Sequence, residues 1–240
     1  MWRLLTCVTV AAFLSFAAAA DIAVEDVNVQ EPWVAGEWSL LDIYEAIYGV
    51  DTGYDTSDEL YEAVGVDPDD YNGPDLSYFF GQQGIGLEAR YASYTHKLGY
   101  YDPVLPDAIA NQNLLFTVSG PYVDPGSSGG PSAVLDPAVE PYGFYLNVNR
   151  TTREWYSEYD RNSDAWVHML LLAAPDEYVA ENGISYLLAW EDLCADDPND
   201  DWDYNDLVVL VGVVPEPSSI MLVGLGIASL AVGRLRKLLA

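Results

Sequence analysis

Acidic residues are crowded into one short stretch near the C-terminal end of the chain, residues 187–214. Its eight carboxylates lie between two apolar runs, 187–190 and 207–211, whose aliphatic and β-branched residues predict buried strands. Like charges at such spacing repel one another, and a bound cation relieves the repulsion. Because hard oxygen ligands favour Ca²⁺, this hairpin-like connection predicts a calcium site. The candidate ligands are Asp201, Asp203, Asn205 and Asp206, followed by Glu191 and Asp192 from the opposite strand end.

The spacing of Asp201, Asp203 and Asn205 matches the first half of a D-x-D-x-N calcium loop, but the stretch is not an EF-hand. Position 6 is Asp206 where an EF-hand needs glycine, and position 12 is Gly212 where a bidentate glutamate belongs. A strand, not a helix, is expected to follow. The alternative interpretation is a solvated acidic loop that binds no ion.

Two motifs of this stretch, Glu191-Asp192-Leu193 and the run 203–209, resemble the C-terminal signature of a bacterial extracellular domain, domain of unknown function 4114. The resemblance covers residues 140–214. It implies a secreted, β-rich module of the kind found in surface proteins, and it implies no reaction. Upstream segments that fit the same family are 142–146, 155–157 and His168.

The net charge of −29 limits the classes of partner. Between residues 21 and 214 there are 5 basic and 37 acidic residues, so this part carries −32. Such a charge argues against binding to nucleic acid or anionic lipid and suits a secreted, cation-binding protein. The 18 Tyr and 7 Trp argue against a disordered chain. Beyond the leader only Cys194 remains, which excludes an intrachain disulfide and a cysteine-based zinc site.

The first 20 residues have the pattern of a secretory signal peptide. Arg3 supplies the positive start, residues 4–16 form the apolar stretch, and small residues precede the expected cleavage before Asp21. The residues expected to define the cleavage site are Ala18 and Ala20.

Residues 21–80 are expected to form a small helical segment. Ser39 and Asp42 have capping-box spacing at the start of an amphipathic helix that ends at Gly49. A second helix is predicted from Thr56 to Gly65. The acidic loop after each helix invites an EF-hand interpretation, but two capped helices with polar connections fit the spacing better.

After residue 80 the periodicity changes to two, and residues 81–214 predict an antiparallel β-sandwich or jelly roll. Residues 120–141, rich in proline and glycine, are expected to form a long surface loop. The predicted strands are one long or two short strands within 85–101, then 114–119, 144–148, 165–174, 184–190 and 207–214.

The tail, residues 215–240, combines a Pro-Glu-Pro motif, an apolar run over 218–233 and a basic end. The run has 16 residues, slightly short of the roughly 17–25 usual for a spanning helix, and the basic end predicts a cytoplasmic C-terminus. This order resembles the PEP-CTERM sorting signal of Gram-negative bacteria. The resemblance implies processing by an exosortase, an inner-membrane intermediate, and an extracellular-matrix destination in a bacterium that produces exopolysaccharide. The signal residues are Pro215, Glu216, Pro217, Arg234 and Arg236.

The preferred function is that of a non-enzymatic exported surface or matrix protein with a Ca²⁺-binding acidic loop. A carbohydrate-binding module for extracellular polysaccharide is the alternative, because tryptophan and tyrosine stack on sugar faces. A glycoside hydrolase with paired carboxylates is the third interpretation, although no nucleophile or metalloprotease motif is present. The aromatic residues considered for sugar binding are Trp155, Tyr156, Tyr159 and Trp202.

Overall fold

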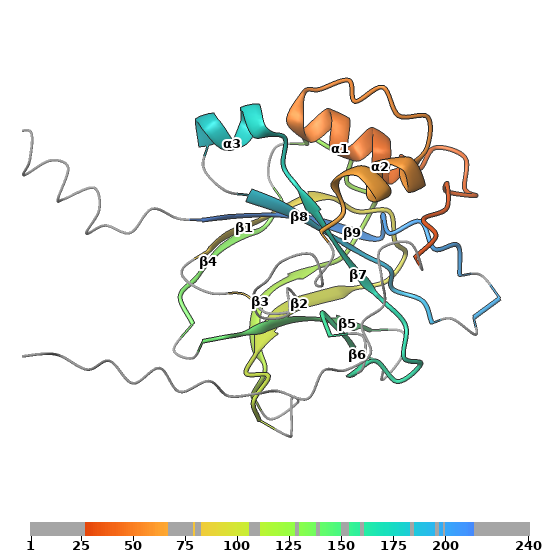
Figure 1. Ribbon diagram of the computed structural model, residues 1–240. Coiled ribbons are helices and arrows are strands. Elements are labelled where there is room, and N and C mark those ends of the chain that lie inside the picture. Colours follow the sequence, from red (N-terminus) through yellow and green to blue (C-terminus); the bar gives the residue numbers. More distant parts are fainter. Residues whose placement is uncertain are drawn as a thin grey trace, which may run out of the picture.

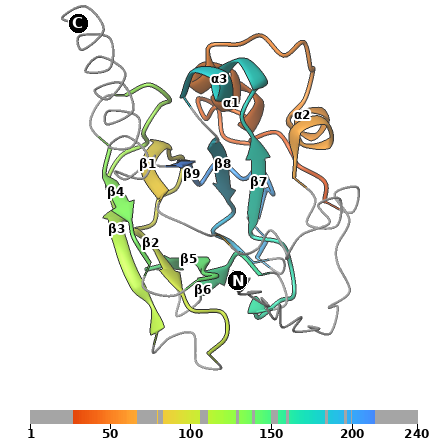
Figure 2. The ribbon, with the colours of Figure 1, turned by 60° about the vertical axis from the view of Figure 1, so that its left-hand side comes forward.

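In a computed structural model of the protein, two antiparallel sheets face each other, and three helices lie on the outer side of one of them (Figure 1). Figure 2 shows the same order of layers from another side. The structure describes residues 27–66, 79, 83–105, 111–127, 130–137, 140–149, 154–158, 161–182, 185–194, 197–198 and 200–213.

The first sheet has five strands, with β9 at its centre between β1 and β8. The predicted hairpin is confirmed, because β8 and β9 pair antiparallel from Ser185↔Gly212 to Trp190↔Leu207. In sheet order the strands are β4 (Ser132–Leu135), β1 (Gln83–Ala89), β9 (Leu207–Val213), β8 (Ser185–Trp190) and β7 (Met169–Ala173).

The second sheet has four strands. The alternating stretch 85–101 divides into two strands, β1 and β2, and these belong to different sheets. The chain therefore crosses from one layer to the other between Ala89 and His96. In sheet order the strands are β3 (Asn113–Val118), β2 (His96–Tyr101), β5 (Gly143–Val148) and β6 (Glu154–Tyr156).

Strands β7, β8 and β9 of the five-stranded sheet are buried on both faces, which explains why they are almost continuously apolar. Successive side chains of a strand point to opposite faces. In β8, Leu188 packs into the core between the two sheets, whereas Leu187 packs into a second core beneath the helices. In β9 the same division separates Val209 from Val208. One sheet thus supports both the second sheet and the helical layer.

The two predicted N-terminal helices are present and have the predicted caps. Helix α1 (Leu40–Tyr48) begins where Ser39 Oγ accepts the N–H of Asp42, and it ends at Gly49 in the left-handed conformation. Helix α2 (Ser57–Val64) begins where the Thr56 side chain accepts the N–H of Glu59. Each cap satisfies a backbone donor that the first turn leaves free.

Both helices pack on the five-stranded sheet, sharing the outer core with residues of β7, β8 and β9. Helix α3 (Asp176–Asn182), which buries no residue, was not predicted.

The prediction of a mainly β fold with antiparallel sheets is confirmed. Two details are wrong. The predicted surface loop 120–141 contains the edge strand β4. The predicted strand 165–174 is shorter, since only β7 (Met169–Ala173) pairs, and Ala165 before it has a φ of 58°, outside the strand region. No helix of the described part is long and apolar enough to cross a membrane. The predicted leader, its Ala18–Ala20 cleavage site and the predicted spanning helix 218–233 lie outside the described residues.

Candidate functional site

Two residues in the loop before β9 adopt the left-handed backbone conformation. Trp202 and Tyr204 both have a φ of 54°, in the left-handed region that residues with a side chain rarely adopt. Each such residue costs on the order of 1 kcal/mol or more and persists only where its surroundings hold it. As a result, the predicted ligands do not form one group. Asp206 joins Glu191 and Asp192, whereas Asp201 and Asp203 join Glu37.

The inner carboxylate group consists of Glu191, Asp192 and Asp206. One oxygen from each lies within 4.8 Å of the others. The hairpin brings them together, because Glu191 and Asp192 follow β8 directly and Asp206 precedes β9, while Trp190 is paired with Leu207. The backbone N–H of Asp192 donates to Asp206 Oδ2 at 2.8 Å. The prediction that Glu191 and Asp192 reach Asp206 across the hairpin is thus consistent with the geometry.

The inner carboxylate group carries more acceptors than donors. Glu191 Oε1 accepts the N–H of Leu193 at 3.0 Å, but Oε2 is buried and meets no hydrogen-bond donor among the described residues. Burial, and then the charge of Asp206, raise the pKa of Glu191 well above its usual range. Burial and the charge of Asp192 do the same to the pKa of Asp206. A proton shared between Glu191 and Asp206, or a bound cation, would relieve the repulsion within this group.

Two basic side chains lie behind this group. His96 Nε2 is 2.7 Å from Asp192 Oδ2. Burial, followed by the charge of Arg90, lowers the pKa of His96 to about 3, so a neutral imidazole donates its Nε2–H to the carboxylate. Arg90 is fully buried, and its guanidinium donates to backbone carbonyls, that of Gly120 at 3.0 Å and that of Tyr94. Arg90 is therefore a fixed positive charge beside the inner carboxylate group.

The outer carboxylate group consists of Glu37, Asp201 and Asp203, again with oxygens within 4.8 Å of one another. Asp203 is buried and accepts two bonds from Asn205, from the backbone N–H at 3.1 Å and from Nδ2 at 2.8 Å. Asn205 Nδ2 also donates to the carbonyl of Trp38. Glu37 could not be identified from the sequence, because 164 positions separate it from Asp201 and only the folding of the N-terminal segment onto the sheet brings the two together.

The outer carboxylate group predicts a pH dependence of stability. Burial raises the pKa of Asp203 from 3.8 to about 9, so between these values the folded chain holds a proton that the unfolded chain releases. The free energy of unfolding should therefore fall as the pH rises from 7 to 9, by at most about 1.4 kcal/mol per unit for one group. His96 opposes this fall only slightly near pH 7, because its imidazole is neutral in the folded chain and already mostly neutral in the unfolded chain.

The measurement is urea denaturation in calcium-free buffer at pH 7, 8 and 9. Asp203→Asn, which mimics the protonated carboxyl, should flatten the fall, while the raised pKa values of Glu191 and Asp206 leave a residual slope of the same sign. A stability that rises over this range would contradict the assignment.

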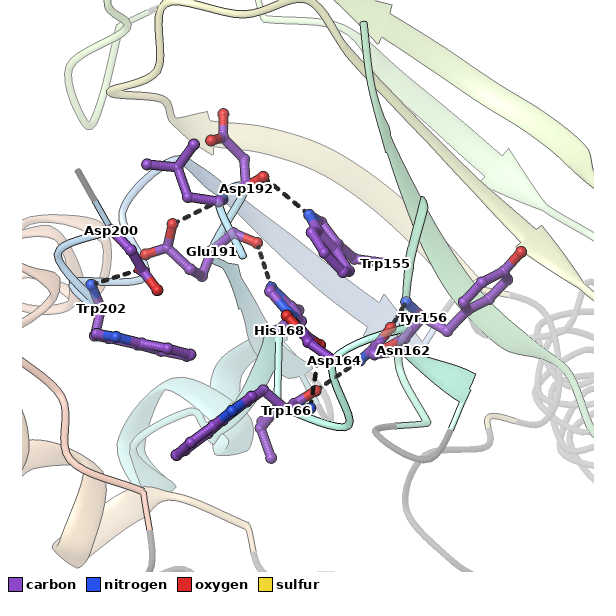
Figure 3. A network of polar contacts seen from close by, with 12 residues as sticks. Trp155, Tyr156, Asn162, Asp164, Trp166, His168, Glu191, Asp192, Asp200 and Trp202 are labelled. Carbon is purple, nitrogen blue, oxygen red and sulfur yellow. Dashed lines mark hydrogen bonds and ion pairs between the residues drawn. The ribbon is translucent and has the colours of Figure 1, made fainter. Parts of the chain in front are cut away.

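The aromatic residues considered for sugar binding are mostly inside the protein. Trp155 and Tyr156 are buried and belong to the core of the protein, so they are not available for stacking on a sugar, and Tyr159 lies outside the described residues. The Trp155 ring stacks on His168, with centroids 3.7 Å apart, and its Nε1–H donates to the carbonyl of Asp192 at 2.9 Å (Figure 3). Trp155 belongs to β6, so this bond joins the four-stranded sheet to the end of β8. Of the three candidates that the structure describes, Trp202 is the one that keeps access to solvent, since it is half-buried.

Comparisons with known proteins support the sorting signal. Residues 213–237 match the family described as PEP-CTERM protein-sorting motif, and no curated protein sequence matches significantly. Among solved structures, the C-terminal domain of BC2L-C lectin from Burkholderia cenocepacia is similar at 18% identity, with a TM-score of 0.29, over 55% of this chain and 85% of that chain. The resemblance of residues 140–214 to domain of unknown function 4114 rests on the sequence motifs alone. The matched span contains the predicted signal residues 215–217 and 234–236, and the chain thus carries a PEP-CTERM sorting motif, which supports export and processing by an exosortase.

Proposed function

We propose that this exported protein is a non-enzymatic surface or matrix protein that binds Ca²⁺ through the inner carboxylate group. The observation that carries the proposal is the buried Oε2 of Glu191, which meets no described donor while two further carboxylates lie within 4.8 Å. An unpartnered buried carboxylate is costly. A calcium ion offsets this cost, because it prefers an all-oxygen environment and tolerates irregular geometry.

The structure of the hairpin supports a stabilising role for the ion. Glu191 and Asp192 directly follow β8 and Asp206 directly precedes β9, so an ion held by all three would link the two ends of the loop that joins these strands. The strained loop between them would then be held at both ends. Arg90 and His96 would not bind the ion. Arg90 balances part of the negative charge of the carboxylates, and His96 fixes the orientation of Asp192.

Calcium should raise the melting temperature of the purified protein. For a site with a dissociation constant of about 10⁻⁴–10⁻³ M, a tenfold excess of Ca²⁺ should stabilise the folded state by about 1.4 kcal/mol. In a domain of this size that corresponds to a rise of about 3–6 °C. The measurement is thermal unfolding with millimolar Ca²⁺, with a chelator, and with Mg²⁺ at the same concentration as a control.

Variants assign the rise to one group. Glu191→Gln combined with Asp206→Asn removes two charged ligands but keeps the shapes of the protonated side chains, so the protein should fold and lose the shift. Asp203→Asn, the matched change in the outer carboxylate group, should keep it. No shift, an equal shift with Mg²⁺, or a shift retained in the double variant would contradict the proposal.

A further inference from the structure

Trp166 and Trp202 form an aromatic platform on the surface, near the end of the sheet that carries the inner carboxylate group. Their ring centroids are 5.0 Å apart with a tilt of 50°, and Trp166 is 46% exposed. Figure 3 shows the two indoles reaching toward each other from opposite sides, with His168 between Trp202 and buried Trp155. Large aromatic rings at a solvent face are enriched where proteins bind partners. We define the two residues as the tryptophan platform.

Hydrogen bonds to the backbone of both tryptophans fix the position of the tryptophan platform. Each tryptophan comes two residues after an aspartate that accepts its backbone N–H: Asp164 Oδ1 accepts from Trp166 at 3.2 Å, and Asp200 Oδ1 accepts from Trp202 at 3.3 Å. The carbonyl of Trp166 accepts from Asn162 Nδ2 at 2.8 Å, whereas that of Trp202 accepts from the N–H of Gln30 at 3.0 Å.

The backbone at the tryptophan platform is strained, with a φ of 58° at Ala165 and 54° at Trp202. Strain of this kind persists at sites that are pre-organised for a ligand.

Negative charge lies directly beside these rings. Asp200 is 7% exposed, and its Oδ2 is buried without a hydrogen-bond partner in the described part of the chain. The carboxylate of Asp201 follows directly in the sequence. A positive group close to Asp200 would lower the cost of its negative charge. The side chain of Asp164 also contacts His168 Nε2 at 3.0 Å, which fixes it at the base of the platform.

We propose that the tryptophan platform binds a polysaccharide that carries protonated amino groups, with a sugar ring stacked on the indoles and its ammonium group directed toward Asp200 and Asp164. The aromatic faces suit the C–H face of a sugar and also attract a cation through their electron-rich centres. The net charge of −32 between residues 21 and 214 draws a cationic polymer and repels an anionic one. A neutral sugar would bring no positive charge to the unpartnered Oδ2 of Asp200. This inference goes beyond calcium binding and does not depend on it.

The test is a titration of the whole purified protein in calcium-free buffer, followed by tryptophan fluorescence and calorimetry. The probes are oligosaccharides of glucosamine, with the amine protonated, and fully N-acetylated oligosaccharides of the same length. We expect the glucosamine oligomers to bind at least tenfold more tightly. Choline, a cation without a sugar ring, should bind at least tenfold more weakly than the glucosamine oligomers.

Three variants locate the binding. Trp166→Ala should weaken binding at least tenfold, and Asp200→Asn, which keeps an oxygen acceptor for the N–H of Trp202 but removes the charge, should weaken it severalfold. Trp33→Ala, which removes a tryptophan that is 63% exposed outside the platform, should leave affinity unchanged. Melting curves of each variant confirm folding. Equal binding of acetylated oligomers, equal binding of choline, or affinity unaffected by Trp166→Ala would overturn the proposal, the last by showing only general attraction to an acidic surface.

Discussion

Replacing Arg90 with methionine should lower the free energy of unfolding by about 3–5 kcal/mol, because it leaves buried carboxylates without their fixed counter-charge. The guanidinium is fully buried, donates to the carbonyls of Gly120 and Tyr94, and lies within electrostatic reach of Asp192 and Asp206. Burial alone lowers the pKa of Arg90, and the two aspartates counteract that effect. The measurement is urea denaturation in calcium-free buffer.

Lys97→Met is the matched control for Arg90→Met. Lys97 is an exposed basic residue of β2, so its replacement should change stability by no more than about 0.5 kcal/mol. Arg90→Lys should recover only part of the loss, because a single ammonium group cannot reach the several carbonyls that the planar guanidinium contacts. A loss below about 1 kcal/mol in Arg90→Met would show that the inner carboxylate group is fully protonated and needs no neighbouring cation.

Trp155→Ala should also destabilise the fold by about 3–5 kcal/mol, the range found when a large aromatic side chain is removed from a core. Trp155 is 1% exposed, stacks on His168, and donates to the carbonyl of Asp192 at 2.9 Å. Its loss leaves a cavity between the two sheets and an unsatisfied carbonyl next to the inner carboxylate group. Chemical denaturation followed by circular dichroism measures the effect.

Trp155→Phe separates packing from hydrogen bonding. This variant keeps a ring in contact with His168 but removes the N–H donor, so about 1–3 kcal/mol of the loss should remain. Trp166→Ala, at the partly exposed tryptophan of the platform, is the control and should cost much less. If Trp155→Ala and Trp166→Ala were equally mild, Trp155 would not join the sheets in the way that its contacts indicate.

The elements that local physics determines were predictable from the sequence. Capping residues at Ser39 and Thr56 mark real helix starts, because the side-chain acceptors satisfy donors that lie only three residues away. Alternation predicted strands within 85–101, and the apolar runs on either side of the acidic loop predicted the pair β8 and β9. These signals need only neighbours in sequence, and the structure confirms them.

The arrangement of the candidate site depends on contacts that the sequence does not contain. The alternation of Asp201, Asp203 and Asn205 suggested one ion-binding loop, but left-handed turns at Trp202 and Tyr204 divide its carboxylates between two groups. Glu37 joins the outer carboxylate group only because the helical layer folds back onto the sheet. Likewise, Trp155 stands among polar residues in the sequence, yet its position in β6 turns the ring into the core.

The position of β9 at the centre of its sheet has a mechanical consequence. The sorting motif begins at Val213, the last residue of β9, and β9 is hydrogen-bonded on one side to β1 and on the other to β8. A force on the tail along the strand axis would therefore shear the hydrogen bonds that join β9 to both β1 and β8, so that many of them have to break together. An edge strand would instead peel away from a single neighbour, one bond after another. A force that reaches the protein through the tail thus acts on a strand that is paired along both of its edges.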